Sequence, residues 1–159
     1  MSELTIKHTI NAPSAAVWAV LADFGGIHRF HPAVDRSPLL GEASGGLGAK
    51  RACHFYDGNS IVEEVVGWEE GKSMRINIVE GSMPLQCANA EIELDRQGPH
   101  RTEVTFTMRY EPKYGPVGRL MDKFMMRSKF GDLLEQVLAG LDQHTRTGAL
   151  IGEGGVVPP

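Results

Sequence analysis

Residues 87–110 read CANAEIELDRQGPHRTEVTFTMRY, and apolar side chains alternate with polar ones on both sides of a turn signal at 96–100. The apolar positions are Ala88, Ala90, Ile92 and Leu94 before the turn and Val104, Phe106, Met108 and Tyr110 after it. A period of two gives each strand one apolar face, which is typical of antiparallel strands that cover a core on one side. The segment therefore predicts two neighbouring strands of a half-buried sheet.

Strands of the same kind fill the chain from about residue 34 to residue 111. Turn signals rich in Gly, Asp, Asn and Pro divide this stretch into six segments, without a helix-length periodic run between them. Asp57-Gly58 is the strongest of these signals, because both residues tolerate the positive φ of tight hairpin turns. Residues 4–10 also alternate and place His8 with the apolar side chains. We expect about seven antiparallel strands.

Two helical patterns flank the strands. The first covers residues 13–23, and a long amphipathic one runs from Pro116 to about His144, with Gly131 as a candidate bend. Between the first helix and the meander, DFGGIHRFHP at 23–32 reads as a corner or a short distorted helix, since its two glycines and its proline interrupt regular structure. The order strand, helix, meander, long helix predicts an α+β fold in which a curved sheet wraps around one helix.

Bulk composition narrows the possible functions. A chain of 159 residues suits one domain, which we place at residues 1–147, with a flexible Gly- and Pro-rich tail at 148–159. A net charge of −4 with scattered Lys and Arg lacks the footprint of a nucleic-acid binder, and no segment approaches the roughly 20 apolar residues of a membrane span. Cys53 and Cys87 form no CxxC pair, so a reducing cytoplasm is expected.

The interior can be interpreted in two ways. Alanines of the strand at 87–94 would lie opposite Met121, Met125 and Met126, whose flexible side chains fill space adaptably and could leave room for a ligand. A dry, close-packed core accounts for the same pattern, and periodicity alone favours that reading.

Six segments of the chain match the pattern of a known family. In order they are INAPSAAVWAVLADF, FHPAVDRS, LGAKRACHF, SIVEEV, EGSMPL and VTFTMRYEP. Through them the sequence resembles, over about residues 3–143, the SRPBCC superfamily, the helix-grip group that includes START domains, birch-pollen-type allergens and polyketide cyclase/dehydrase-like proteins. EGSMPL resembles the gate loop, and Phe30 stands where tryptophan is more usual. The resemblance implies a helix-grip fold with a deep, mostly apolar pocket between sheet and long helix, used for lipids, hormones or aromatic polyketides.

One glutamate of SIVEEV is expected in the pocket. Alternation leaves open whether Glu63 or Glu64 points inward, and the resemblance selects Glu63. A carboxylate among apolar neighbours has a raised pKa or a partner, because burying an unpaired charge is costly. The alternative is a glutamate on the rim, paired with Arg51 or Lys50.

The histidines at 28 and 31 have separate expected roles. The resemblance places His31 at the pocket entrance, able to bond a polar head group or Glu63, whereas His28 faces solvent. A metal site would need a third ligand, such as His8 or His54, and HxxH alone is weak evidence, so no metal is expected. A lone histidine on an apolar stripe, such as His8, is more often a satisfied core residue. GEASGGLGAK lacks the end of a phosphate-binding loop, and we expect no cofactor.

The leading functional hypothesis is a module that binds a small hydrophobic molecule. One alternative is a polyketide cyclase/dehydrase-like enzyme in which Glu63 and His31 act as acid and base. The other is a chaperone-like or partner-binding protein, and the lack of an obvious exposed apolar patch in the sequence counts against it. A homodimer is left open. The expected ligand-binding residues are His31, Glu63, Phe55, Ile76, Ile78, Met83, Pro84, Ala88, Ala90, Phe106, Met108, Tyr110 and Met125.

Overall fold

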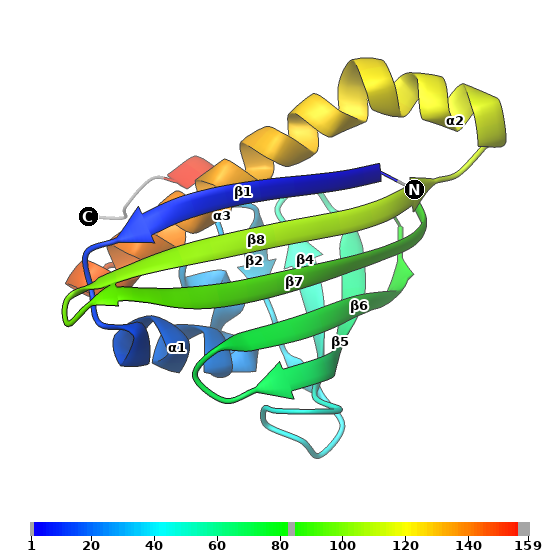
Figure 1. Ribbon diagram of the computed structural model, residues 1–159. Helices are drawn as coiled ribbons and strands as arrows, with labels where there is room; N and C mark the ends of the chain where they lie inside the picture. The colour runs from blue at the N-terminus through cyan, green and yellow to red at the C-terminus, as the bar shows by residue number, and fades with distance from the viewer. Residues whose placement is uncertain (1, 83–84, 156–159) are drawn as a thin grey trace.

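The structure is a computed structural model that describes residues 2–82 and 85–155. Its strands form one antiparallel sheet in the order β1-β8-β7-β6-β5-β4-β2, with β3 paired to β4. Figure 1 shows the sheet curving around the long C-terminal helix, so the expected α+β helix-grip architecture is confirmed. The strands are β1 (Ser2–Ile10), β2 (Val34–Arg36), β3 (Leu39–Leu40), β4 (Lys50–Phe55), β5 (Ser60–Glu69), β6 (Ser73–Gly81), β7 (Leu85–Gly98) and β8 (Arg101–Pro112).

The described part of the chain has eight strands where the sequence predicts about seven. The difference lies at residues 34–40, which were expected to form one strand and form β2 and β3 instead. Pro38 stands between the two pieces and has no N–H to give to a ladder, although its carbonyl accepts a bond from Ala52. The interruption leaves a short, bent sheet edge beside the site described below.

Two short helical segments close one end of the curled sheet (Figure 1). Helix α1 spans Ser14–Ala22, and the 3-10 helix η1 spans Phe24–Arg29, which confirms a distorted helical corner within DFGGIHRFHP. Trp18 of α1 packs edge to face on Trp68 of β5, with 5.0 Å between ring centroids, and both indoles donate to the carboxylate of Glu70. These contacts fix α1 against the sheet.

The long C-terminal helix has an irregular turn near its start. Helix α2 (Gly115–Met121) leads through a π-helical turn, η2 (Asp122–Met126), into α3 (Arg127–Thr147). The expected bend at Gly131 is wrong, because the irregularity is at η2 and α3 runs through Gly131. None of the helices in the described ranges is long and apolar enough to cross a bilayer.

The segment after α3 packs against the η1 corner. Ile151 is buried, its N–H donates to the carbonyl of Arg29, and the N–H of Gly154 donates to Pro32. The sequence predicts a flexible tail from residue 148, and as far as Gly154 the structure instead holds this segment by backbone hydrogen bonds.

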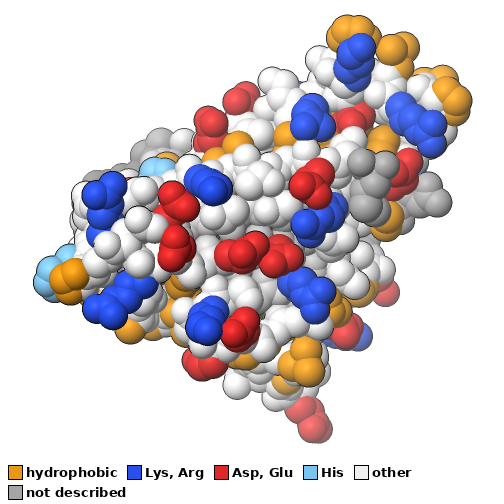
Figure 2. All heavy atoms as spheres, viewed as in Figure 1, with side chains coloured by type: hydrophobic (Ala, Val, Ile, Leu, Met, Phe, Trp, Pro, Cys, Tyr) orange, Lys and Arg blue, Asp and Glu red, His pale blue; other side chains and the backbone are white. Residues whose placement is uncertain are grey.

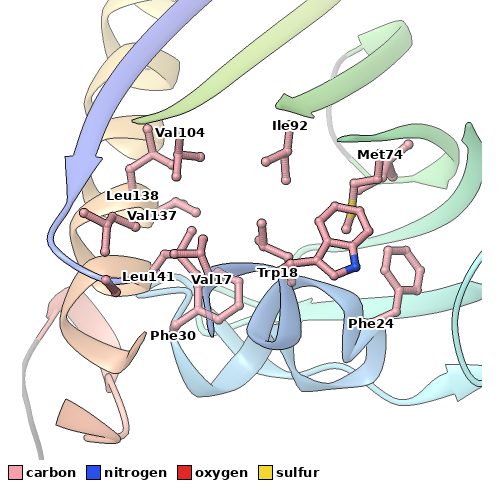
Figure 3. Packing of buried hydrophobic residues seen from close by; sticks show 14 of the residues in the cluster. Val17, Trp18, Phe24, Phe30, Met74, Ile92, Val104, Val137, Leu138 and Leu141 are labelled. Atoms are coloured by element: carbon pink, nitrogen blue, oxygen red, sulfur yellow. The ribbon is translucent and has the colours of Figure 1, made fainter. Parts of the chain in front are cut away.

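The main core lies between the concave face of the sheet, α1, η1 and α3 (Figure 3). Gly140 allows α3 to approach the corner closely, since a Cβ built there would lie 2.1 Å from the carbonyl oxygen of Phe30. A second cluster around Tyr110 and Phe130 fills the space under the start of the long helix. The core residues labelled in Figure 3 are Val17, Trp18, Phe24, Phe30, Met74, Ile92, Val104, Val137, Leu138 and Leu141.

Candidate functional site

An internal cavity of about 80 Å³ lies between α3, the η1 corner and strands β4 to β8. A fully close-packed interior is therefore excluded, although the cavity is smaller than the roughly 300–1,000 Å³ typical of sites for drug-sized ligands. Its wall is mostly aliphatic and aromatic. Besides the residues discussed below, it is lined by Leu21, Asp23, Ile27, Phe30, Val34, Ile61, Met74, Ile92, Leu133, Leu134, Val137, Leu138 and Leu141.

A buried ion pair stands in this apolar wall. Arg51 on β4 and Glu63 on β5 are opposite one another in the sheet register, and Arg51 Nε donates to Glu63 Oε1 at 2.9 Å. The guanidinium also donates to the carbonyl of Phe24 at 2.9 Å and lies 3.8 Å from the centroid of that ring. Arg51 is therefore held on three sides, which compensates for its removal from water.

Glu63, and not Glu64, faces the cavity, as expected. Glu64 points to the other face of the sheet and lies 3.4 Å from Lys50. Both readings of Glu63 were partly right, since it is inside the cavity and also paired with Arg51. Burial by itself would raise the pKa of the Glu63 carboxyl, but the Arg51 charge and the hydrogen bonds from Cys53 and Arg51 hold it below its ordinary value. Glu63 is thus a carboxylate at neutral pH.

His31 is a neutral hydrogen-bond donor to the cavity. Its Nδ1 accepts the backbone N–H of Ala33 at 3.1 Å, so the proton of the neutral ring is on Nε2. Burial lowers the pKa of His31 to about 4, with the Arg51 charge acting in the same direction and Glu63 opposing it. The ring packs edge to face on Phe55, with 6.2 Å between centroids.

Glu63 and His31 each present a polar atom that has no hydrogen-bond partner among the described residues. Glu63 uses Oε1 for both of its hydrogen bonds, which leaves Oε2 as an acceptor. His31 uses only Nδ1, which leaves Nε2–H as a donor. Neither atom is fully buried. Glu63 and His31 therefore offer the cavity an acceptor and a donor in mostly apolar surroundings.

Cys53 is unsuited to nucleophilic chemistry. Its thiol donates to Glu63 Oε1 at 3.2 Å, and burial raises its pKa, with the negative charge of Glu63 adding to the effect. Because the thiolate is the nucleophile, a thiol held protonated beside a carboxylate is inert.

The other histidines are accounted for by structural contacts. His8 Nε2 lies 2.7 Å from Asp142 on α3, which confirms a satisfied histidine on the apolar stripe. His28 is half-buried, not solvent-facing as expected, because its Nδ1 lies 2.7 Å from the hydroxyl of Ser37. No three His, Cys, Asp or Glu side chains gather as a metal site within residues 2–82 and 85–155.

The expected ligand-binding residues divide between several places. Phe55, Ile76, Ala90 and Phe106 line the cavity with Glu63 and His31. The other positions differ: Ile78 and Ala88 line a separate pocket of about 90 Å³ near Gly81, Met108 and Tyr110 belong to the cluster around Phe130, and Met125 is exposed. Tyr110 donates its hydroxyl proton to Asp122, and burial together with this bond raises its pKa to about 12. Met83 and Pro84 lie outside the described residues.

Arg51 was expected only as an alternative partner of a glutamate on the rim, and most of the α3 wall was not expected. The pairing of Arg51 with Glu63 could have been found from the register of the β4–β5 hairpin. Gly58 has φ 91°, and Phe55 donates its N–H to Asn59, so the turn has three residues. That turn places Arg51 across from Glu63, whereas a two-residue turn would place it across from Glu64.

A surface groove of about 380 Å³ adjoins the cavity. Phe55 and Leu133 line both spaces and separate one from the other. The rest of the groove comes from the loop after His31, the β4–β5 turn, α3 and the segment after it, with Pro32, Tyr56, Asp57, Gln136 and Glu153 among its residues.

The neutral state of His31 makes a testable prediction about pH. Its pKa is about 4 when folded against 6.5 in an unperturbed chain, so between these values the unfolded chain binds a proton that the folded one does not. The stability that the neutral His31 allows is therefore complete above pH 6.5 and is lost as the pH falls to 4. Over this range the free energy of unfolding should decrease by about 3 kcal/mol. Urea unfolding over this range should show the loss in the wild type and not in His31→Gln. The exposed His100→Gln is the matched control, and an equal loss in His31→Gln would contradict the assignment.

The curved sheet and the long C-terminal helix define a helix-grip protein. The chain belongs to the family described as polyketide cyclase / dehydrase and lipid transport, whose model matches residues 1–146, and with it to the SRPBCC superfamily. No curated protein sequence matches the chain.

Solved structures of the same fold support this assignment. A protein from Thermobifida fusca is 25% identical, with 91% of this chain and 93% of that one covered and a TM-score of 0.74. A START superfamily protein from Mycobacterium smegmatis is 13% identical, with 91% and 97% covered and a TM-score of 0.76. The Zhui aromatase/cyclase from Streptomyces sp. R1128 is 18% identical, with 98% and 99% covered and a TM-score of 0.71. The last two show the fold alone.

Proposed function

We propose that the protein binds a small, mostly apolar molecule with one uncharged polar end in the cavity between the sheet and α3. The observation that carries this proposal is the unpartnered pair of atoms, Oε2 of Glu63 and Nε2–H of His31, in an apolar wall. A hydroxyl group fits both, because it can donate to the carboxylate and accept from the imidazole. An anionic end is disfavoured by the charge of Glu63.

The size of the cavity also restricts the ligand. About 80 Å³ accommodates a small molecule or part of a larger one. A longer apolar molecule would have to extend past Phe55 and Leu133 into the groove. The expected binding residues are therefore His31, Glu63, Phe55, Ile76, Ala90 and Phe106.

Electrostatics favours binding over acid–base catalysis. An efficient general acid or base has a pKa near the working pH, and the pKa values of Glu63 and His31 are both lowered away from neutrality. The lowered pKa of Glu63 leaves it ionised and weakly basic, and His31, with a pKa of about 4, is a weak base that carries no acidic imidazolium at neutral pH. A cyclase or dehydrase activity, which the family description and the Zhui aromatase/cyclase suggest, is therefore our second hypothesis after ligand binding.

Filling the cavity should abolish binding without unfolding the protein. In Ala90→Leu three added carbon atoms occupy the cavity, and we expect both a retained small molecule and an apolar fluorescent probe to be lost. Native mass spectrometry of the purified protein and fluorescence titration measure the two effects.

Ala52→Leu is the matched control. Ala52 lies on β4 between Arg51 and Cys53, so its side chain points to the opposite face of the sheet, outside the cavity. It should retain the wild-type ligand and probe signals. Equal binding by Ala90→Leu and the wild type, or no bound molecule and no probe uptake in either, would count against an internal binding site.

A further inference from the structure

An apolar stripe on α2 and η2 faces solvent. Five of its side chains are exposed by about half or more, namely Val117 (64%), Leu120 (59%), Met121 (43%), Phe124 (70%) and Met125 (55%), with Tyr114 (71%) just before the helix. We name these six residues the α2 patch. Their spacing of three, four and seven residues places them along one side of the helix. No exposed apolar patch was expected from the sequence, and that expectation is wrong.

The exposure of the patch follows from how the opposite side of the helix is fixed. Gly118, Asp122, Met126 and Phe130 follow at intervals of four and face the protein. A Cβ at Gly118 would lie 1.7 Å from the carbonyl oxygen of Lys113. The buried carboxylate of Asp122 accepts hydrogen bonds from the hydroxyls of Ser2 and Tyr110. Because these contacts fix the rotation of the helix about its axis, the α2 patch cannot turn toward the core without breaking them.

Positive charge surrounds the patch. Residues 113–129 hold five basic side chains and one acidic one, and the acid is the buried Asp122. Within the described chain none of the five forms an ion pair, although Arg127 donates to the backbone carbonyl of Glu3 and Lys123 lies 5.8 Å from the ring centroid of Phe124. Figure 2 shows blue and orange side chains together on the projecting end of the helix. The five exposed cations are Lys113, Arg119, Lys123, Arg127 and Lys129.

We propose that the α2 patch docks the protein on an anionic lipid bilayer surface. Apolar side chains on a projecting helix can enter the boundary between head groups and acyl chains, while the flanking cations attract anionic lipids. The charge distribution argues against a second copy as the occupant, since a two-fold contact through the patch would bring five cations toward five. The helix also projects beyond the sheet (Figure 1), so it can reach a flat surface without obstruction.

Vesicle co-sedimentation tests the proposal. The wild type should sediment with vesicles of phosphatidylcholine mixed with phosphatidylserine, more weakly with phosphatidylcholine alone, and more weakly as salt increases. Leu120→Ser combined with Phe124→Ser should lower the partition coefficient at least about tenfold, because the double variant removes two large apolar side chains from the surface that the bilayer would bury. Arg119→Glu combined with Lys123→Glu should remove the preference for anionic vesicles.

Matched controls separate docking from general changes in polarity and charge. Leu47 is 69% exposed on the loop before β4, and the Lys72 side chain is 72% exposed on the β5–β6 turn, so Leu47→Ser and Lys72→Glu should sediment like the wild type. The proposal is overturned by absence of wild-type binding to the mixed vesicles, by equal losses in patch and control variants, or by a dimer in analytical ultracentrifugation that the patch variants abolish. Each readout is made without cargo and so is independent of the ligand proposed for the cavity.

Discussion

Arg51→Met should lower the free energy of unfolding by about 3–5 kcal/mol at neutral pH, the usual cost of removing one partner of a buried ion pair. Methionine replaces the apolar stem but leaves Glu63 with only the Cys53 thiol as a donor, in a cavity where burial opposes ionisation. The carbonyl of Phe24 would also lose its guanidinium donor. Urea denaturation of both proteins measures the difference.

The pH dependence of this loss identifies its cause. In the variant only the hydrogen bond from Cys53 offsets burial, so the pKa of Glu63 rises and the carboxyl takes up a proton as the pH falls from neutral. The difference from the wild type should therefore shrink with decreasing pH. In Arg51→Met combined with Glu63→Leu most of the stability should return at neutral pH, because no unpaired charge remains. A loss that is independent of pH and persists in the double variant would show that packing, not charge, is responsible.

Gly140→Ala should destabilise the protein by about 1–3 kcal/mol, the usual range for forcing extra atoms into a packed site. The new Cβ would lie 2.1 Å from the carbonyl oxygen of Phe30, so either α3 or the η1 corner must move. The shift would carry His31, the next residue after Phe30, away from the cavity. Probe binding should therefore weaken together with stability.

Gly131→Ala is the matched control on the same helix. A Cβ at Gly131 meets no atom within 4 Å, so alanine should stabilise α3 by up to about 1 kcal/mol through its better helix propensity. Thermal unfolding and probe titration of both variants distinguish a local clash from a general effect of substitution in the helix. Equal stability changes at the two positions would contradict the close approach of α3 to Phe30.

Most of the architecture could be predicted from local periodicity. Alternation at residues 88–94 and 104–110 identified the inner face of the sheet, because side chains on one face of a strand recur every second residue. The strand at 34–40 was predicted as continuous because a periodic pattern does not show how Pro38 interrupts pairing with β4. Gly131 was predicted as a bend for a similar reason. Glycine has a low helix propensity, but tertiary contacts decide where the helix becomes irregular, and that position is η2.

The candidate site was less predictable because it depends on register and on element length. Glu63 could be named, but its partner Arg51 is twelve residues away and is fixed by the three-residue turn at Gly58. Met125 has the spacing of a core residue, yet the long helix extends past the sheet at that point, so it is exposed. Amphipathic spacing shows that a helix has an apolar side, but it does not show whether other parts of the protein cover that side.

The hydrogen bonds from Ile151 to Arg29 and from Gly154 to Pro32 have a consequence for biosynthesis. The loop carrying His31 emerges early from the ribosome, but the backbone that supports it is made only after α3. A nascent chain can therefore form the sheet meander before the support of the His31 loop is complete, and that loop should become fully held only once residue 154 has cleared the exit tunnel.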